Sequence, residues 1–554
     1  MANKVIIIGG VAGGASTAAR LRRLNENAEI ILIEKGEYIS YANCGLPYYI
    51  GGTIEDREEL FVMTPEKFKS WFNIDIRTKS EAVRIDRDNK EVEISNLRTG
   101  DSYRENYDYL VLSPGAEPIR PPLPGIDNKK IFSMRSVSDT DRLFDFIRTA
   151  NPGRAVVVGA GYIGLEMAEN LQHRGLEITV VELAPQVLPP IDHEMAALVQ
   201  QYMREMNMNL RLGNGVKEFH EGNNKSLSVE LSDGEMLNTD LVVLSIGVKP
   251  EIKLASESGL EVNRGIIVNS RMQTSDPAIF ALGDAVEVKH LVTGKPAVIP
   301  LAGPANKQGR IVANNIAGRK DRYKGTQGTS VLKIFDMTVA TTGANERLLQ
   351  AENIEYNKII VHPNDHAGYY PGAKPISLKL LFSSEGNILG AQAVGYSGVE
   401  KRIDVIATAL RAGLTVYDLH DLELSYAPPY SSAKDPVNMV GFVASNLLDA
   451  DYETTEAADL INNLTPDRQI IDVREVEEYE EGNIAGSINI PLGAIRERVN
   501  ELDPKKETVT YCSIGLRSYF AKRILKQKHF KKVKNLNGGY RTYQALESEN
   551  KLMS

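Results

Sequence analysis

The chain has 554 residues, of which 42% are hydrophobic and 25% charged, which is typical of a soluble globular protein with three or four domains. Its net charge of −9 gives no reason to expect nucleic acid or a membrane as partner, and no apolar run approaches the roughly 18 residues that span a bilayer. Two cysteines cannot build a disulfide framework, so we expect a cytoplasmic protein.

The chain opens with the pattern of a dinucleotide-binding βαβ unit, so we expect no signal peptide here. The pattern is a strand, a glycine-rich turn, a helix and a strand ending at an acid: Val5–Ile8, Gly9–Gly14, Ala15–Leu24, Ile30–Ile33 and Glu34. Glycines let backbone N–H groups approach a pyrophosphate at a helix N-terminus, and the acid accepts from a ribose hydroxyl. Val11 stands where the fingerprint has its second glycine.

A second copy of this unit is complete. The strand Ala155–Val158 leads into Gly159–Gly164, and the next strand, Ile178–Val181, ends at Glu182. An acid at this place accepts from a ribose 2′-hydroxyl and repels a 2′-phosphate. The sequence therefore favours NADH, with NADPH as the alternative.

Two later stretches have other patterns. The segment from Gly328 to Val443 reads as α+β, with a helix over Val399–Ala412 and strands over Ser330–Ile334, Val339–Thr342, Lys358–Val361, Ile376–Phe382 and Ile388–Val394. A polar and acidic stretch, residues 447–456, reads as a linker. An α/β pattern follows, in which the strand Thr508–Tyr511 leads into Cys512.

Several motifs resemble those of the pyridine-nucleotide disulfide oxidoreductase family. The stretch Ala278–Ala285 resembles its second flavin motif, and Leu110–Ala116 its connecting motif between the flavin and nicotinamide halves. The α+β segment resembles its dimerisation domain, which implies a homodimer. In the last segment, four stretches resemble a rhodanese domain: Gln469–Arg474, Gly482–Pro491, Thr508–Ser518 and Asn537–Tyr540.

The resemblance implies an α/β fold with two Rossmann-like FAD/NAD(P)-binding domains, an α+β dimerisation domain and a C-terminal α/β rhodanese domain. The expected domains are FAD-binding (1–115 and 250–327), NAD(P)H-binding (116–249), dimerisation (328–446), linker (447–456) and rhodanese (457–554). FAD is expected at Gly9, Gly10, Ala12, Gly13, Glu34, Lys35, Ser113, Pro114, Gly115, Gly283 and Asp284. The nicotinamide cofactor is expected at Gly159, Gly161, Tyr162, Ile163, Gly164 and Glu182, and no metal is expected.

Cys44 has no second cysteine near it, so an internal redox disulfide is excluded. Within the family, a lone cysteine forms either a sulfenic acid, as in NADH oxidases and peroxidases, or a mixed disulfide with coenzyme A. Ser40–Cys44 resembles the Ser-Phe-x-x-Cys motif of coenzyme A-disulfide reductases, with Tyr41 for Phe, and Gly9–Gly14 lacks the histidine of the peroxidases. Ser425–Tyr430 and His366–Gly372 also resemble reductase segments.

This class implies that coenzyme A disulfide, and a persulfide or polysulfide of coenzyme A, are substrates. Tyr426 and either Tyr369 or Tyr370 would reach the partner subunit's Cys44 and protonate the leaving thiolate. The expected coenzyme A groove comprises Ser16, Arg20, Arg23, Ser40, Asn43 and Lys434. By spacing alone, Arg20 and Arg23 could equally form a solvated basic helix face.

Cys512 lies between a strand and a helix, where backbone N–H groups can stabilise a thiolate and then a persulfide. Arg517 adds positive charge to this loop, and we expect it to bind substrate. We therefore expect a sulfur-transferring rhodanese. The alternative for the whole chain is an NADH oxidase or peroxidase with a rhodanese domain that only docks a sulfur carrier.

Overall fold

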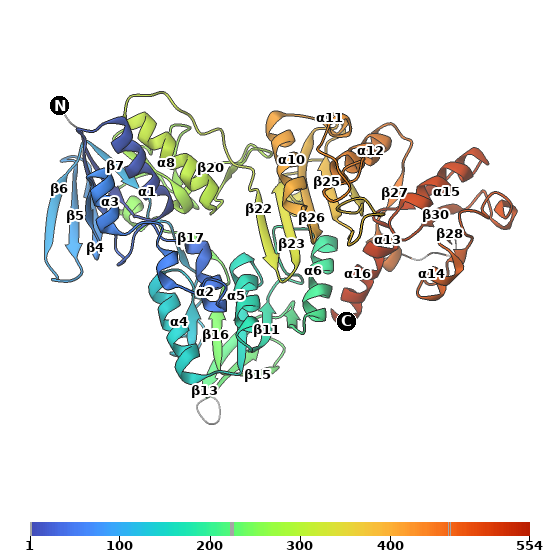
Figure 1. Cartoon of the computed structure of the whole chain (residues 1–554), viewed down its shortest axis with the longest axis horizontal. Coiled ribbons are helices and arrows are strands. Elements are labelled where there is room, and N and C mark those ends of the chain that lie inside the picture. The colour runs from blue at the N-terminus through green and yellow to red at the C-terminus, as the bar shows by residue number, and fades with distance from the viewer. Residues whose placement is uncertain (1–2, 222–225, 464, 466, 554) are drawn as a thin grey trace. The chain divides into compact units, whose positions relative to one another are not determined.

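A computed structural model describes residues 3–221, 226–463, 465 and 467–553 of the chain. The chain divides into two compact units (Figure 1). The first comprises Met1–Val181 and Asn214–Gly328, and the second comprises Glu182–Gly213 and Thr329–Ser554.

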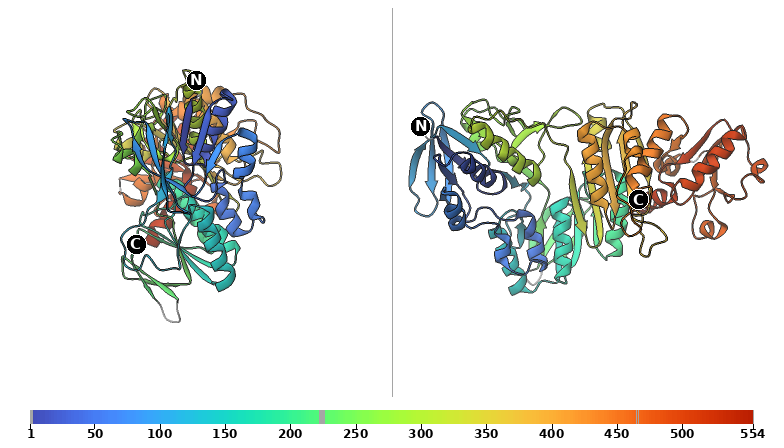
Figure 2. Two further views of the ribbon diagram at one scale, coloured as in Figure 1. Left: turned by 90° about the vertical axis from the view of Figure 1, so that its left-hand side faces the viewer. Right: turned by 45° about the horizontal axis from the view of Figure 1, so that its top comes forward.

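The first unit contains a five-stranded sheet with parallel neighbours. Its strands, in spatial order, are β19 (Ile279–Ala281), β7 (Tyr109–Leu112), β1 (Lys4–Ile8), β2 (Glu29–Ile33) and β3 (Asp75–Arg77). The four strands other than β3 are almost wholly apolar because both of their faces are buried, whereas the edge strand β3 carries Asp75 and Arg77 and is partly exposed. Helices α1 (Ala12–Leu24) and α8 (Ala302–Ile316) lie side by side in this unit (Figures 1 and 2).

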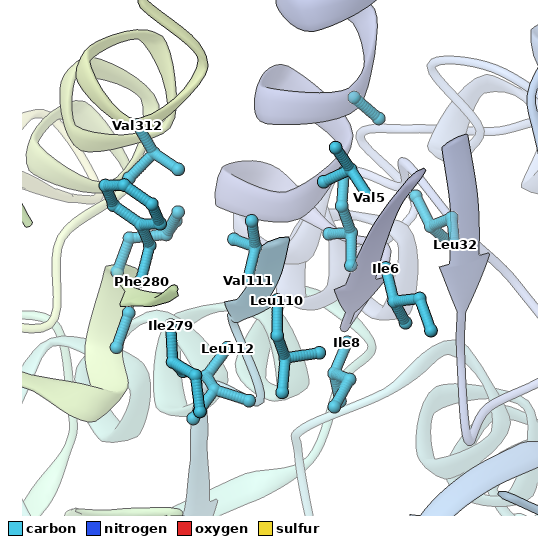
Figure 3. Close-up of a cluster of buried hydrophobic side chains, with 14 of the residues drawn as sticks. Val5, Ile6, Ile8, Leu32, Leu110, Val111, Leu112, Ile279, Phe280 and Val312 are labelled. Atoms are coloured by element: carbon cyan, nitrogen blue, oxygen red, sulfur yellow. The ribbon is translucent and has the colours of Figure 1, made fainter. Parts of the chain in front are cut away.

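The core of this sheet is continuous from strand to strand. Figure 3 shows Val5, Ile6, Leu110 and Val111 packed between the strands, with Phe280 beside them, and all five are at most 2% exposed. Smaller elements surround the sheet: α2 (Leu46–Gly51), α3 (Pro65–Phe72), β4 (Ser80–Asp86), β5 (Glu91–Asn96), β6 (Ser102–Asn106), α7 (Lys253–Glu257), β18 (Ile266–Ile267), β20 (Val286–Lys289) and β21 (Pro296–Ala297).

A second parallel sheet in the same unit carries the other glycine-rich turn. Four of its five strands are, in spatial order, β11 (Glu177–Glu182), β10 (Arg154–Val158), β16 (Leu241–Leu244) and β9 (Ile131–Ser133). Helices α4 (Val137–Ala150) and α5 (Tyr162–His173) and a three-stranded sheet of β13 (Val216–Glu221), β14 (Leu227–Leu231) and β15 (Met236–Thr239) complete this part. Two antiparallel strands, β8 (Ala116–Pro118) and β17 (Val248–Pro250), connect the two halves of the unit.

The second unit contains an antiparallel sheet. The structure confirms the expected strand over Ser330–Ile334 and the expected helix over Val399–Ala412. Helix α10 (Val399–Ala412) packs on the central strands (Figure 1). The strand order is β22 (Ser330–Ile334), β23 (Met337–Gly343), β26 (Ile388–Gly395), β25 (Ser377–Phe382) and β24 (Asn357–Val361). The other elements are α6 (His193–Glu205), β12 (Asn209–Leu212), α9 (Glu346–Ala351), α11 (Val416–Asp421) and α12 (Pro436–Leu448).

The C-terminal part of this unit is a parallel α/β fold. Its strands run in the order β27 (Thr454–Thr455), β31 (Val533–Leu536), β30 (Glu507–Tyr511), β28 (Arg468–Asp472) and β29 (Ile488–Asn489). Its helices are α13 (Ala457–Asn462), α14 (Val476–Glu480), α15 (Leu516–Gln527) and α16 (Gly539–Met553).

The linker expected over residues 447–456 is shorter in the structure. Helix α12 continues to Leu448, and Thr454 and Thr455 pair with β31. Tyr452 between them is buried, and its hydroxyl accepts a hydrogen bond from Asn535 at 2.7 Å. Although this stretch is mostly polar, the buried Tyr452 anchors it to the C-terminal α/β fold.

Among the described residues, no helix combines the length and the apolar character that a membrane span requires.

Candidate active sites

The first glycine-rich turn is shaped by close backbone packing. Gly9 has a φ of +96°, and a Cβ there would lie 2.0 Å from the carbonyl oxygen of Ser113. A Cβ on Gly14 would lie 1.8 Å from the carbonyl oxygen of Gly9. Helix α1 begins at Ala12, three residues before the expected start at Ala15, and no side chain caps its N-terminus. The first N–H groups of α1 are therefore available to an anion such as a pyrophosphate.

Two carboxylates of the flavin half fit different parts of a dinucleotide. Glu34, at the end of β2, accepts from the N–H groups of Gly10 at 2.8 Å and Gly36 at 2.7 Å. Asp284, in the turn Gly283–Ala285, makes no side-chain hydrogen bond to any described residue, and burial raises its pKa. A half-buried carboxylate that accepts no hydrogen bond from the described residues suits the hydroxyl groups of a flavin side chain. By contrast, Lys35 pairs with Glu81 at 2.7 Å.

The second turn has room for a pyrophosphate. Gly159 has a φ of +100°, and a Cβ there would lie 2.4 Å from the carbonyl oxygen of Ser245. A Cβ on Gly161 would meet no atom within 4 Å, so open space lies in front of this backbone. Tyr162 and Ile163 begin α5, and Glu182 is the last residue of β11. The turn therefore fits a second dinucleotide.

Cys44 lies in a short turn of 3₁₀ helix, Asn43–Gly45, directly before α2. Its side chain is exposed. The surrounding protein atoms nevertheless keep part of the solvent away from the thiol, which raises its pKa. The negative charges of Glu166 and Asp284 raise this pKa further. The side-chain amide of Asn43 makes two hydrogen bonds with Arg135. Its oxygen accepts from the guanidinium group at 2.9 Å, and its nitrogen donates to the backbone carbonyl oxygen at 3.3 Å. The chain alone thus disfavours a Cys44 thiolate, and groups that bind beside it must supply compensating interactions.

A basic cluster lies on α1, on α8 and in the loop that follows α8. Partial burial lowers the pKa of Arg20, and the like charges of Arg310, Arg319 and Arg23 lower it further. Arg20 donates to Asn314 at 3.2 Å, and Ser16 donates to Asn306. Clustered guanidinium groups of this kind are suited to phosphate groups.

Arg22, on the same helix, has another role. Its buried guanidinium donates to the backbone carbonyl oxygens of Phe72 at 2.7 Å and Asn73 at 2.8 Å. It holds α3 against α1 and is not part of the basic cluster.

The exposed tyrosines of the second unit separate into a pair and single residues. The hydroxyl groups of Tyr369 and Tyr426 are 2.8 Å apart, and both side chains are exposed. Tyr370 instead packs edge-on against His366, with ring centroids 5.7 Å apart. The hydrogen bond with Tyr426 raises the pKa of Tyr369. The structure thus pairs Tyr426 with Tyr369 and leaves Tyr370 apart.

Ser40 and Lys434, two other residues of the expected groove, each make one contact of note. Ser40 has a φ of +47°, and its N–H donates to the carbonyl oxygen of Gly10 at 2.9 Å, which ties the Cys44 stretch to the first turn. The ammonium group of Lys434 lies 5.9 Å from the ring centroid of Phe442.

Cys512 is fully buried directly after β30, and its sulfur accepts two hydrogen bonds. Its sulfur accepts from the N–H of Gly515 at 3.2 Å and from the hydroxyl of Ser518 at 3.4 Å. Tyr540 donates its N–H to the carbonyl oxygen of Cys512 at 2.8 Å, so the start of α16 supports the loop. Donors aimed at a sulfur stabilise a thiolate and the anion of a persulfide.

Arg517, which we expected to bind substrate, pairs with Glu478 on α14. Its two terminal nitrogens lie 2.6 Å and 2.7 Å from the two carboxylate oxygens. Ser513 also donates to Glu478, at 2.8 Å, and these bonds lower the pKa of Glu478 to about 2. Glu478 thus neutralises the arginine beside Cys512.

Sequence reasoning missed several residues that the fold brings to these sites. They are Tyr48, Arg135 and Glu166 near Cys44, Arg310 and Arg319 in the basic cluster, and Glu478 and Ser518 near Cys512. None lies in a motif with diagnostic spacing except Ser518, which follows Arg517 in the loop. Their proximity arises from packing between distant elements.

The chain has two nucleotide-binding turns, and the exposed Cys44 lies between them in the sequence. The buried Cys512 accepts hydrogen bonds in a separate α/β domain. This combination is typical of an oxidoreductase joined to a sulfur-handling domain. The family model of pyridine nucleotide-disulphide oxidoreductases matches residues 3–309, and the dimerisation domain of that family matches residues 329–436. The chain belongs to the pyridine nucleotide-disulphide oxidoreductase family. A rhodanese-like domain matches residues 453–546. These matches confirm the expected fold class, and the family implies FAD and NAD(P)H.

Solved structures cover almost the whole chain. The reduced CoADR-RHD of Bacillus anthracis is 51% identical with a TM-score of 0.96, covering 99% of each chain. The NAD-dependent persulfide reductase from A. fulgidus is 39% identical with a TM-score of 0.92, covering 98% of this chain and 100% of its own. The coenzyme A disulfide reductase of Staphylococcus epidermidis is 37% identical over 448 residues, which is 80% of this chain and 100% of that relative.

Proposed function

We propose that this protein uses NADH to reduce coenzyme A disulfide, and coenzyme A persulfide or polysulfide, through a mixed disulfide between Cys44 and coenzyme A. The observation that carries this proposal is that Cys44 is exposed and has no redox partner in its own chain. The only other cysteine, Cys512, is buried among its own hydrogen-bond donors. The sulfur that bonds to Cys44 on oxidation must therefore come from a substrate.

The two glycine-rich turns divide the cofactors between them. The first turn, Glu34 and Asp284 would hold FAD, and the second turn and Glu182 would hold NADH. Bound FAD would pass two electrons from NADH to the disulfide at Cys44. Glu182 would accept from the ribose 2′-hydroxyl of NADH and repel the 2′-phosphate of NADPH.

The residues of the chain carry the sulfur chemistry. The Cys44 thiolate attacks one sulfur of coenzyme A disulfide, a Cys44–coenzyme A disulfide forms, and one coenzyme A thiolate leaves. Two electrons then cleave the mixed disulfide, which restores the Cys44 thiolate and releases the second coenzyme A as thiolate. Two protons, one from solution and one from NADH, convert both products to thiols. With a persulfide, the products are one coenzyme A thiol and hydrogen sulfide.

The basic cluster would bind the phosphate groups of coenzyme A. Arg20, Arg23, Arg310 and Arg319 supply the positive charge, and Ser16 lies on the same helix face as Arg20 and Arg23. Ser40 and Asn43, from the same unit, would complete the groove. We further propose a homodimer, in which Tyr369 and Tyr426 of the partner subunit protonate the leaving coenzyme A thiolate.

The rhodanese domain would handle the sulfane sulfur. The Cys512 thiolate would accept a sulfur atom from a persulfide donor, leaving the donor as thiolate, and the persulfide anion would be stabilised by the N–H of Gly515 and the hydroxyl of Ser518. Transfer of that sulfur to coenzyme A thiolate would produce the persulfide that Cys44 reduces.

The test is NADH consumption by the purified holoenzyme with coenzyme A disulfide, coenzyme A persulfide, oxygen and hydrogen peroxide as separate acceptors. Turnover with the first two acceptors well above that with oxygen or peroxide is expected. Turnover with peroxide or oxygen alone would contradict the proposal and favour a Cys44 sulfenic acid.

A further inference from the structure

A carboxylate of helix α14 is hydrogen-bonded to the loop that follows Cys512. Glu478 accepts from the two terminal nitrogens of Arg517, at 2.6 Å and 2.7 Å, and from the hydroxyl of Ser513 at 2.8 Å. Arg517 also donates to the Ser513 hydroxyl at 3.0 Å. Because Ser513 directly follows Cys512 in the chain, the carboxylate lies beside the loop that carries the reactive sulfur.

This carboxylate cancels the positive charge of the loop. The stretch Cys512–Ser518 has one charged residue, Arg517, and its guanidinium is paired with Glu478 through two parallel hydrogen bonds. The bonds from Arg517 and Ser513 lower the pKa of Glu478 to about 2, so the carboxylate is ionised at neutral pH. The loop side chains and Glu478 together therefore present no net positive charge to a sulfur donor.

The guanidinium is close enough to the sulfur for its charge to matter. Its hydrogen bonds with Glu478 raise the pKa of Arg517, and the charge of a Cys512 thiolate raises this pKa as well. Gly515 and Ser518, on either side of Arg517 in the same loop, both donate to the Cys512 sulfur, at 3.2 Å and 3.4 Å. An unpaired Arg517 would therefore attract an anionic donor to this site.

The other exposed side chains of the loop are apolar. Ile514 and Leu516 are 41% and 47% exposed, whereas the Cys512 sulfur is fully buried. A donor must give up its water to reach a buried sulfur, and this costs a dianion far more than an uncharged group. A loop with apolar exposed side chains and no net positive charge therefore suits a donor that has no charge near its sulfur atoms.

We propose that Glu478 determines the donor specificity of the rhodanese domain: by neutralising Arg517 it disfavours thiosulfate, a dianion, and selects a persulfide at the end of an uncharged organic arm. The Cys512 thiolate attacks the terminal sulfur of the persulfide, the S–S bond of the donor breaks, and a new S–S bond forms on Cys512. The terminal sulfur keeps its proton, and the donor leaves as a thiolate. Thiosulfate would instead release sulfite.

This inference rests on the proposed function and names the kind of molecule that the rhodanese site accepts. Coenzyme A persulfide fits it, because its sulfur atoms end an uncharged amide arm and its phosphate groups lie at the other end. Loading of Cys512 from coenzyme A persulfide is the reverse of the transfer to coenzyme A proposed above, so one site must admit this arm in both directions.

The experiment measures the second-order rate constant for persulfide formation on Cys512, by mass spectrometry of the Cys512 peptide. The full-length holoenzyme with free thiols is mixed, without NADH, with coenzyme A persulfide or with thiosulfate. Glu478→Gln leaves the charge of Arg517 uncompensated, so the ratio of the two rate constants should move toward thiosulfate about tenfold, and added salt should reduce this gain. Equal ratios in the wild type and Glu478→Gln, or faster loading of the wild type by thiosulfate, would overturn the proposal.

A second variant keeps the test decisive if Glu478→Gln does not fold. Arg517→Gln leaves the carboxylate without its cation, so the ratio should move away from thiosulfate, in the direction opposite to that of Glu478→Gln. A loop that is merely loosened would shift both variants in the same direction, and that result would overturn the proposal. Glu477→Gln, which removes an exposed carboxylate of the same helix, is the matched control and should keep the wild-type ratio.

The outcome is separate from that of the reduction at Cys44, because loading of Cys512 needs neither NADH nor Cys44. A wild-type protein that is loaded by neither donor would overturn this inference. An absence of NADH consumption with coenzyme A disulfide and coenzyme A persulfide would instead contradict the proposed function.

Discussion

The Nε2 atom of His362 lies 3.0 Å from the carbonyl oxygen of Gly538, so a histidine of the antiparallel sheet's domain holds the segment that supports the Cys512 loop. The same ring interacts through Nδ1 with the hydroxyl of Ser377 at 2.8 Å. Two residues after Gly538, the N–H of Tyr540 bonds to the carbonyl oxygen of Cys512. The rhodanese site is thus supported from the neighbouring domain.

Replacing His362 by alanine should loosen this junction. The variant removes the buried partner of the Ser377 hydroxyl and one of the two hydrogen bonds to the carbonyl oxygen of Gly538, which keeps the bond from the Thr542 hydroxyl at 3.2 Å. Loss of a buried hydrogen-bond partner costs about 2 kcal/mol of unfolding free energy. Urea unfolding followed by circular dichroism measures it. His220→Ala, at a partly exposed position on β13 of the first unit, is the control and should change stability little. Equal midpoints for both variants would contradict the structural role.

The same histidine should make stability depend on pH. Burial lowers the pKa of His362 to about 3, whereas in the unfolded chain it titrates near 6.5. Below pH 6.5 the unfolded chain binds a proton that the folded chain does not, so the free energy of unfolding falls with falling pH, by up to about 1.4 kcal/mol per pH unit.

Urea unfolding of the wild type and of His362→Gln between pH 7 and pH 5 isolates this contribution. Glutamine can donate to Gly538 but does not titrate, so its stability should fall less steeply than that of the wild type. Over this range most carboxyl groups stay ionised, and Glu166, whose pKa burial raises to about 7, is common to both proteins. Parallel slopes would show that His362 is protonated in the folded state.

Cys44→Ser should separate the two halves of the reaction. NADH should still bleach the flavin absorbance in a stopped-flow measurement, because the second turn and Glu182 are unchanged. Steady-state NADH consumption with coenzyme A disulfide should fall to background, since serine cannot form the mixed disulfide. Disulfide turnover that persists in this variant would remove Cys44 from the mechanism.

Cys512→Ser should abolish sulfur transfer by the rhodanese domain and leave disulfide reduction at Cys44 intact. Transfer of sulfur from thiosulfate or a thiol persulfide to cyanide measures the first activity, and NADH consumption with coenzyme A disulfide measures the second. Unchanged sulfur transfer in this variant would rule Cys512 out as the residue that carries the sulfur. Ser518→Ala, which removes the 3.4 Å hydrogen bond to the sulfur and keeps the thiol, should retain part of the transfer activity.

The sequence predicts those parts of the fold whose cause is local. The helix over Val399–Ala412 has regularly spaced apolar residues between Gly398 and Gly413, which both adopt positive φ, and its bounds are confirmed. The first helix begins earlier than expected because Gly13 and Gly14 are helical. Their small size serves packing, since a Cβ on Gly13 would lie 2.1 Å from Leu282, which is remote in sequence.

For the candidate sites too, the sequence predicts the residues that lie in local motifs but not the contacts between distant segments. Cys44 and Cys512 stand in recognisable motifs, so their neighbours along the chain could be expected. The pair Tyr48 and Glu166 is separated by 118 positions, and Glu478 and Arg517 by 39, so these contacts exist only because helices pack together. Charge compensation, such as that of Arg517 by Glu478, therefore could not be predicted from the composition of the loop.

Tyr369→Phe and Tyr370→Phe form a matched pair of variants that differ in one observed contact. The hydroxyl of Tyr369 shares a hydrogen bond with Tyr426, whereas Tyr370 packs by its ring against His366. If a phenol protonates the leaving coenzyme A thiolate, Tyr369→Phe should lower kcat for coenzyme A disulfide about 10²-fold, the usual effect of removing a general acid. Tyr370→Phe should retain most of the activity, because its ring is kept. The kcat values of both variants, measured with saturating NADH, decide the assignment, and a larger loss in Tyr370→Phe would reverse it.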